Sequence, residues 1–162
     1  MFRKMRRWKQ SLPEEQCIAI LKKGTSGVLA VHGDDDYPYA VPLSYVYTKE
    51  KLYFHSAVSG HKLDAIRQND KVSFCVTDQD TIVPEEYTTY FRSVIVFGRA
   101  HVLEGEEKRR AIELLAEKYS PDDPEGRCQE IDREYARLCM IELKIEHMTG
   151  KEAIELVRAK AD

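Results

Sequence analysis

The segment from His55 to Lys62, which reads HSAVSGHK, gathers several groups that could bind an anion. It holds the hydroxyls of Ser56 and Ser59, a glycine at position 60 and a lysine where a helix is expected to begin. Free backbone N–H groups at a helix N-terminus and a positive side chain together favour phosphate binding. The segment is not a P-loop, because histidine rather than lysine follows the glycine. The alternative is a capped surface turn without a ligand.

Metal-binding patterns are absent from the sequence. No spacing of cysteine and histidine matches a zinc site, and there is no H-E-x-x-H motif. The acidic run Asp34–Asp36 does not match a calcium loop, because Pro38 takes the fifth position and no glycine follows at the sixth. We therefore expect no metal site, and the run GDDDYP predicts the turn of a β-hairpin.

The elements that would position the anion-binding segment follow from hydrophobic periodicity. Short or alternating apolar runs predict six strands, at 28–31, 39–47, 52–54, 72–76, 90–103 and 139–147. Apolar residues three and four apart predict four helices, at 11–24, 62–68, 106–119 and 128–138. Ser11 and Glu14 have the spacing of a capping box for the first helix. The segment therefore joins the third strand to the second helix.

Three residues constrain the sheet that these strands form. Pro42 cannot donate to a strand ladder, so its strand must lie at an edge, be kinked or face a ligand. Gly98 allows the long fifth strand to bend sharply, as a barrel requires. Glu142 and its alternate neighbours in the sixth strand are expected to face water. The pattern predicts an α+β fold with a small six-stranded antiparallel β-barrel and peripheral helices, because closure removes exposed edges.

Length and composition restrict the class of protein. The 162 residues suit one domain, 1–162, and the net charge of −3 argues against a nucleic-acid-binding protein. No apolar run reaches the ~20 residues that cross a membrane, so we expect no membrane partner. Four cysteines without a C-x-x-C motif, and no secretion signal, favour a cytoplasmic location.

The charge is unevenly distributed along the chain. Residues 1–10 form a basic N-terminal arm with five Lys or Arg and no acid, so the remaining residues carry a net charge of −8. The arm could contact phosphate or an anionic membrane, but the simpler interpretation is a solvated arm on an acidic body or a partner subunit. At the other end, residues 150–162 predict a helical tail.

Four segments in order resemble a known family: VPLSYVY, LYFHSAVSGHKLDAI, NDKVSFCV and YFRSVIVFGRAHVL. With GDDDYPYAVPLSYVY and the YFHSA…GHK spacing, they are similar to the pyridoxamine 5′-phosphate oxidase-like flavin-binding proteins, in particular the nitroimidazole-reductase (Nim) branch. The resemblance runs from about residue 5 to Gly150. It implies a six-stranded antiparallel split β-barrel and a homodimer with one FMN at each of two sites lined by the subunit interface.

The resemblance also implies which residues contact the FMN. The strand Val41–Ser44 would line the isoalloxazine ring through its backbone, and Phe54–Ala57 would form the next contact segment. His61 and Lys62 would hold the phosphate, and Ser93 would place a polar group near the flavin from a subunit that the sequence does not identify. The implied cofactor-binding residues are Val41, Pro42, Leu43, Ser44, Phe54, His55, Ser56, Ala57, His61, Lys62 and Ser93.

Several of these residues have an alternative role. His55 is the titratable group expected beside the ring, so it is the candidate catalytic residue that contacts substrate or donates a proton; it could equally be a packed, neutral histidine. His61 and Lys62 could be solvated residues at a helix start. Tyr90 and Arg92 could line the substrate side or a subunit interface.

The function implied by the resemblance is that of an FMN-dependent oxidoreductase that reduces a small electron-poor molecule, such as a nitro-aromatic compound. The alternatives are a non-catalytic protein that stores or senses flavin, a pyridoxamine-phosphate-oxidase-like enzyme and, with least support, a haem-binding protein. The chain ends TGKEAIELVRAKAD and lacks the Trp-, Arg- and Pro-rich segment with which pyridoxamine-phosphate oxidases hold their substrate. This difference argues against oxidation of vitamin B6.

Overall fold

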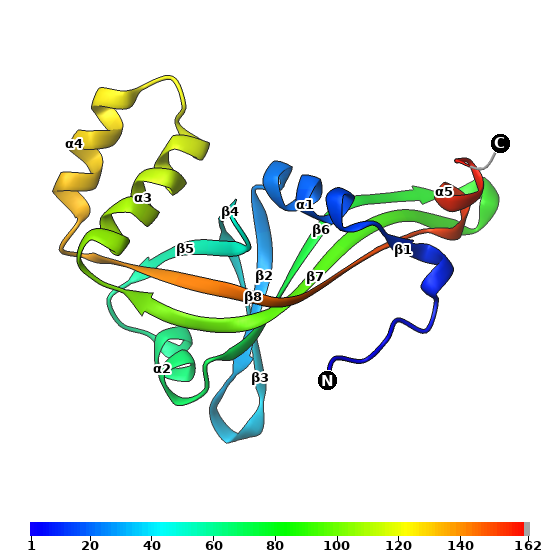
Figure 1. The fold of residues 1–162 in the computed structure, drawn as a ribbon, viewed down its shortest axis with the longest axis horizontal. Coiled ribbons are helices and arrows are strands. Elements are labelled where there is room, and N and C mark those ends of the chain that lie inside the picture. The colour runs from blue at the N-terminus through cyan, green and yellow to red at the C-terminus, as the bar shows by residue number, and fades with distance from the viewer. Residues whose placement is uncertain (161–162) are drawn as a thin grey trace.

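One antiparallel sheet organises residues 1–160, the part of the chain that the computed structural model describes (Figure 1). The strands are β1 (Ser11–Leu12), β2 (Ser26–His32), β3 (Pro38–Ser44), β4 (Val46–Thr48), β5 (Lys51–Ala57), β6 (Lys71–Val83), β7 (Thr88–Leu103) and β8 (Leu138–Glu152). Their order across the sheet is β3-β2-β6-β7-β8-β5-β4, and β1 pairs with β8. The expected α+β class is confirmed.

The two ends of the sheet are joined at Tyr45. β3 pairs with β2, whereas β4 pairs with β5, so the single strand expected at 39–47 is broken between two partners. At the break, the Tyr45 N–H donates to the Tyr119 hydroxyl at 3.0 Å, and the Tyr45 carbonyl accepts from Lys118 Nζ at 3.2 Å. Side chains of a helix therefore satisfy the backbone where the ladder stops. This break and the short β1 give eight strands where six were expected.

The strands β6, β7 and β8 extend beyond the barrel as a long arm (Figure 1). β6 and β7 stay paired as far as Val83 and Thr88, so β6 runs well past its predicted end at 76, whereas β7 begins close to its predicted start at 90. At Gly98 the register between β7 and β8 shifts, and a Cβ there would lie 2.1 Å from the Lys144 carbonyl oxygen. The long strand is thus irregular at Gly98, where a bend was expected, and only glycine fits this close approach.

Five helices lie around the sheet within residues 1–160: α1 (Glu14–Lys23), α2 (His61–Gln68), α3 (Gly105–Tyr119), α4 (Pro124–Glu134) and α5 (Ile154–Arg158). The predicted capping box of α1 is wrong. Pro13 occupies the cap position, and the Ser11 hydroxyl donates to the Trp8 carbonyl instead. The reason is that Ser11 is held in extended conformation by pairing with β8. α4 ends before residue 138 because Leu138 already belongs to β8.

The barrel interior is filled by the chain's own side chains. Tyr45, Phe54 and Phe74 are fully buried, with ring centroids 5.0–5.1 Å apart for the pairs that Phe74 makes. A second apolar cluster joins α3 and α4 to the strands, and its buried members are Val46, Leu103, Ala111, Ile112, Leu115, Ile131 and Met140. Burying each large apolar side chain contributes about 1.5–3 kcal/mol. This cluster therefore fixes the α3–α4 pair against the strand ends beside His55, because His55 pairs with Met140.

Two further expectations are corrected by the structure. Glu142 does not face water: it is 5% exposed, since α3 covers its face of the sheet, and it pairs with Lys51 at 2.8 Å. The expected helical tail 150–162 begins later than predicted, because β8 continues to Glu152 and the helix α5 starts at Ile154. Residues 161–162 of that tail lie outside the described part of the chain.

The basic N-terminal arm lies along the sheet of its own chain. The Phe2 ring stacks on His147, with centroids 4.5 Å apart, and also contacts Phe97 at 5.6 Å. Further along, the Gln10 side-chain amide is buried and donates to the Glu152 carbonyl at 3.0 Å. The arm is therefore anchored at its aromatic start and at its end.

Candidate functional site

The predicted ring-contact strand Val41–Ser44 belongs to β3, which is an edge strand. β3 pairs only with β2, where Pro42 stands opposite Val28. Of the three alternatives that Pro42 left open, an edge strand, a kink or a strand facing a ligand, the structure shows the edge strand. Along β3, Val41 and Leu43 are partly buried, whereas Pro42 and Ser44 are exposed. The outer surface of this strand is thus open to a ligand at Pro42 and Ser44.

The next predicted segment, Phe54–Ala57, alternates between the two faces of β5. Phe54 is fully buried against Phe74, so its side chain lies in the core and only its backbone could meet a ligand. His55 and Ala57 are exposed, and Ser56 is 5% exposed. His55 is therefore not a packed core histidine, and it is available on the surface of the barrel.

A seam between β3 and β5 brings these two segments together. β4 pairs with β5, with Val46 opposite Tyr53. β3 precedes β4 in the chain, and Tyr45 separates the two strands. Residues of β3 and β5 come into contact beyond that break, although no ladder joins them. The seam is therefore a split in the barrel wall, with unpaired strand edges on both sides.

The groups that could form a cradle for an anion lie at the end of β5. Helix α2 begins at His61 after Gly60, whose φ of +136° strongly favours glycine. The side-chain hydroxyl of Ser56 is buried without a hydrogen-bond partner and lies beside the thiol of Cys139, a weak partner at best. Burial raises the pKa of that thiol, whereas its hydrogen bond with Ser56 and then the positive charge of Lys62 oppose the rise. An unpaired hydroxyl, a cation and a helix N-terminus thus occur together, as phosphate binding requires.

His61 makes different contacts from those expected. Its ring stacks on Tyr39 with centroids 4.2 Å apart, and its Nε2 lies 3.7 Å from Asp34 Oδ2 in the acidic hairpin turn. The structure therefore directs His61 toward the turn between β2 and β3. A contact with phosphate would need another orientation of this side chain.

Ser93 lies far from the cradle within one chain. His55 and Leu103 both pair with Met140 of β8, and Ser93 precedes Leu103 by ten residues along β7. At roughly 3.3 Å per residue the separation along the strand is about 33 Å. Ser93 lies instead on the long arm formed by β6, β7 and β8, opposite Thr77 and Lys151. A single chain therefore does not bring Ser93 to the site.

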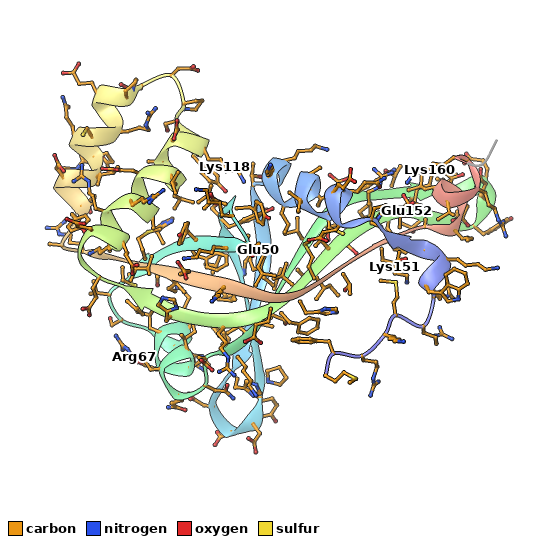
Figure 2. The ribbon with its side chains drawn as sticks, viewed as in Figure 1. Glu50, Arg67, Lys118, Lys151, Glu152 and Lys160 are labelled. Carbon is orange, nitrogen blue, oxygen red and sulfur yellow. The ribbon has the colours of Figure 1, made fainter. Side chains whose placement is uncertain are left out.

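The neighbours of Ser93 on the arm are engaged in ion pairs and hydrogen bonds. Arg92 lies 3.4 Å from Glu152 and 3.5 Å from Asp78, and Lys160 lies 2.7 Å from the same buried Glu152. Figure 2 shows Glu152 and Lys160 together where α5 meets the long arm of β6, β7 and β8. The Tyr90 hydroxyl donates to Glu86 at 2.8 Å. Tyr90 and Arg92 therefore belong to the end of the arm remote from His55.

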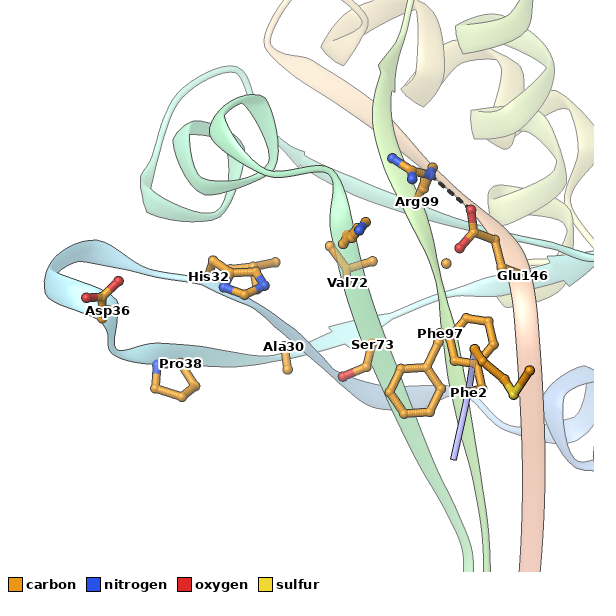
Figure 3. Close-up of a pocket in the computed structure, with 14 residues that line it drawn as sticks. Phe2, Ala30, His32, Asp36, Pro38, Val72, Ser73, Phe97, Arg99 and Glu146 are labelled. Carbon is orange, nitrogen blue, oxygen red and sulfur yellow. Dashed lines mark hydrogen bonds and ion pairs between the residues drawn. The ribbon is translucent and has the colours of Figure 1, made fainter. Parts of the chain in front are cut away.

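Two cavities flank these elements. One, of about 700 Å³, lies between the N-terminal arm and the outer face of β2, β6 and β7 (Figure 3). Phe2, Phe97 and Ser73 border it, and Arg99 pairs with Glu146 at its rim. The other, of about 580 Å³, lies between the α3–α4 pair and the end of β5, where His55, Ser56 and Ala57 form one wall. Both volumes suit a small molecule.

The second cavity contains residues that the sequence did not single out. Arg127 and Arg137 border it, on either side of the buried Ile131. Their spacing follows no motif, and they border the same cavity as His55 because α4 packs on α3 and α3 packs on β5. Among residues 1–160, no group of three or more His, Cys, Asp or Glu side chains is placed to hold a metal ion. No helix in this part of the chain is long and apolar enough to cross a membrane.

An antiparallel barrel whose wall is split between β3 and β5 defines the split β-barrel class of proteins. The chain belongs to the pyridoxamine 5′-phosphate oxidase family, whose sequence pattern matches residues 13–152. An uncharacterized protein of Rhizobium meliloti is 29% identical over 150 residues, which cover 88% of this chain and 93% of the relative.

Three solved structures illustrate the similarity in fold. A candidate 5-nitroimidazole antibiotic resistance protein from Bacteroides thetaiotaomicron aligns with a TM-score of 0.71 and 22% identity, over 88% of this chain and 86% of its own. An FAD-binding protein from Mesorhizobium loti aligns with 0.62 and 27%, over 89% and 97%. The FAD and heme binding protein from Mycobacterium smegmatis aligns with 0.74 and 21%, over 95% and 80%.

Proposed function

We propose that this protein is a flavin-dependent oxidoreductase of the nitroimidazole-reductase type, with FMN bound at the seam between β3 and β5. The observation that carries the proposal is the buried hydroxyl of Ser56, which has no partner other than the thiol of Cys139, a thiol that the positive charge of Lys62 at the start of α2 also influences. A buried polar group without a partner costs stability, so it is retained where a ligand completes it. Flavin-binding proteins are among the solved structures of the same fold.

The residues at the seam suit the parts of FMN. The exposed edge of β3 at Pro42 and Ser44 offers backbone groups to the rim of a flat ring, with Val41 and Leu43 behind it. Ser56, Lys62 and the first N–H groups of α2 suit the phosphate. When bound, a flavin would supply the electron transfer, while the protein positions it and adjusts its potential.

His55 is the residue we assign to substrate contact and proton donation. It is exposed on β5, and it forms part of the wall of the 580 Å³ cavity. An imidazole can hold and release a proton near neutral pH. A non-catalytic flavin store would need no room beside His55, so this cavity supports the enzyme over the storage protein.

We propose that the working unit is a homodimer with its sites at the interface. Ser93 lies about 33 Å from the level of His55 along its own strand, so a polar group at this position can reach a flavin only from a second subunit. The outer face of β2 and β7 exposes Val28, Ile95 and Phe97, each 38–41% exposed. Such an apolar sheet face is typical of a subunit interface.

The substrate class we propose is a small electron-poor molecule such as a nitro-aromatic compound, reduced in the cytoplasm. A candidate 5-nitroimidazole antibiotic resistance protein shares the fold.

The first test is the visible spectrum of the purified protein, followed by chromatography of the flavin released on denaturation. We expect a flavin spectrum and released FMN; a haem spectrum, or a colourless protein that ignores added FMN, would contradict the proposal. A nitroimidazole added anaerobically to the reduced protein should reoxidise the flavin. A flavin that stays reduced would refute the reductase and leave flavin binding intact.

A substitution locates the phosphate site. Lys62→Ala should weaken FMN binding by about 1–3 kcal/mol, the usual contribution of a charged hydrogen bond. Lys22→Ala, which removes an exposed lysine from α1, serves as the control and should leave the affinity unchanged. Titration of flavin-free protein with FMN measures both. If the two variants bind FMN with equal affinity, Lys62 does not contact the phosphate.

A further inference from the structure

The basic N-terminal arm, residues 1–10, and the acidic turn, Asp34–Asp36, carry opposite charges that a single chain leaves apart. We propose that they pair across the homodimer, so that the N-terminal arm of each copy lies on the acidic turn of the other. The proposal rests on the proposed function, because it specifies how the two subunits recognise each other. The partner it names is a second copy of this chain.

The cations of the N-terminal arm are exposed and unused within the chain. None of them forms an ion pair with a residue of the described range 1–160, and they are Arg3, Lys4, Arg6 and Arg7. The N-terminal arm is nevertheless fixed in place, because Phe2 stacks on His147 and the Gln10 amide donates to the Glu152 carbonyl. Positive side chains are therefore held on the surface without a partner from their own chain.

The acidic turn between β2 and β3 is the matching feature. All three of its aspartates are exposed. The one ion pair that they form within residues 1–160 joins Asp34 Oδ2 to His61 Nε2, 3.7 Å apart. Neighbouring carboxylates repel one another, so a partner that brings several positive charges lowers the energy of this turn. The N-terminal arm supplies positive charge of this kind.

The N-terminal arm and the acidic turn flank one face of the sheet from opposite sides. Phe2 lies over β7 and β8, where it contacts Phe97 and His147, whereas the turn joins β2 to β3. Figure 3 shows Phe2 and Asp36 at opposite ends of the cavity of about 700 Å³. The N-terminal arm therefore lies across the face from the acidic turn of its own chain.

A twofold axis through this face brings the unlike charges together. In a symmetric dimer of this kind the same patch meets itself, so one flank of the patch contacts the opposite flank of the partner. The sheet order places β6 between β2 and β7, so an axis at β6 exchanges the β7–β8 flank with the β2–β3 flank. The exposed apolar side chains Val28 and Ile95, which stand on either side of Cys75 in β6, then lie near the centre. Each N-terminal arm thus meets the acidic turn of the other copy, in two equivalent contacts.

The test measures the dissociation constant of the dimer by sedimentation of the full-length, FMN-loaded protein. The arm variant combines Arg3→Gln, Lys4→Gln, Arg6→Gln and Arg7→Gln, and the turn variant combines Asp34→Asn, Asp35→Asn and Asp36→Asn. Asp35 and Asp36 have φ of +53° and +62°, which asparagine also adopts, so the turn should still fold. We expect each variant to raise the dissociation constant at least about tenfold, from several exposed ion pairs lost at each of two contacts. The wild-type dimer should also weaken as the salt concentration rises.

A mixture of the two variants distinguishes pairing between copies from pairing within one copy. The mixed dimer keeps one intact contact, which joins the N-terminal arm of the turn variant to the acidic turn of the arm variant. It should therefore dissociate about threefold less readily than either variant alone, half of the loss on a logarithmic scale. Energy transfer between differently labelled variants measures this. The matched control removes three exposed acids around α3 and α4 by Glu117→Gln, Asp122→Asn and Glu125→Gln, and should dissociate as the wild type does.

Three results would overturn the proposal in different ways. If salt and both variants leave the dissociation constant unchanged, or if the mixed dimer is no tighter than the variants alone, the pairing is wrong although the homodimer stands. If the arm variant loses affinity for FMN and keeps its affinity for a second copy, the cations of the N-terminal arm contact the phosphate of the cofactor instead. If the FMN-loaded wild type is a monomer, the proposed homodimer falls together with the pairing, while flavin binding stands.

Discussion

Replacing Ser56 by alanine should change two properties of this protein in opposite directions. In the flavin-free protein, Ser56 is 5% exposed and its hydroxyl has only the weak Cys139 thiol as a partner, so folding removes it from water with little compensation. An unsatisfied buried group of this kind costs about 1–3 kcal/mol. Removing the oxygen leaves almost no cavity, so Ser56→Ala should raise the free energy of unfolding by about 1 kcal/mol.

The same change should weaken flavin binding. If the hydroxyl donates to the phosphate of FMN, its loss removes a hydrogen bond to a charged group, which contributes about 1.5–3 kcal/mol. Since 1.4 kcal/mol corresponds to about tenfold in affinity, the dissociation constant should rise by roughly 10- to 100-fold. A residue with a purely structural role would not separate the two effects.

Two measurements decide the matter. Urea unfolding of the flavin-free protein gives the stability, and titration with FMN followed by flavin fluorescence gives the affinity. Ser26→Ala, which removes an exposed hydroxyl from β2, is the control and should change neither. A flavin-free Ser56→Ala protein that is less stable than the wild type would show that the hydroxyl already has a partner. An unchanged FMN affinity would place the phosphate elsewhere.

Two further predictions concern the barrel itself. Gly98→Ala should lower the free energy of unfolding by about 1–3 kcal/mol, because the new Cβ would lie 2.1 Å from the Lys144 carbonyl oxygen; an unchanged urea midpoint would contradict this. Burial raises the pKa of Tyr45 above its usual value of 10.0. Above pH 10 the unfolded chain therefore loses the Tyr45 proton before the folded protein does, so the free energy of unfolding is unaffected by this group below pH 10 and falls as the pH rises toward the folded-state pKa. Tyr45→Phe also removes a buried hydroxyl without a partner, so it should be at least as stable at neutral pH and lose less stability above pH 10. Unfolding midpoints on either side of pH 10 test this, and parallel losses in the two proteins would refute it.

Elements with a strong apolar period were predictable from the sequence. The helix at Gly105–Tyr119 and the alternation in β8 follow directly from which positions are apolar, since period 3.6 and period 2 each place one face in a core. The sequence also limited the strand at Pro42 to an edge, a kink or a ligand-facing position, because a missing N–H is a local property.

Features that depend on distant partners were not predictable in this way. The break at Tyr45 arises because Lys118 and Tyr119 satisfy its backbone from another element. Glu142 reads as a solvent-facing residue, yet α3 covers it and Lys51 neutralises it. The arm strands extend past their apolar alternation because ladder hydrogen bonds, rather than burial, hold them.

The sequence by itself determined that a turn with Gly60 and Lys62 lies between a strand and a helix, because residue types and their local spacing specify the start of α2. Only the tertiary structure decided what surrounds that turn. It left the Ser56 hydroxyl buried and unpaired, turned His61 toward Asp34, and carried Ser93 to the far arm. The physical reason is that burial and pairing between residues far apart in the chain depend on how the elements pack, which local spacing does not specify.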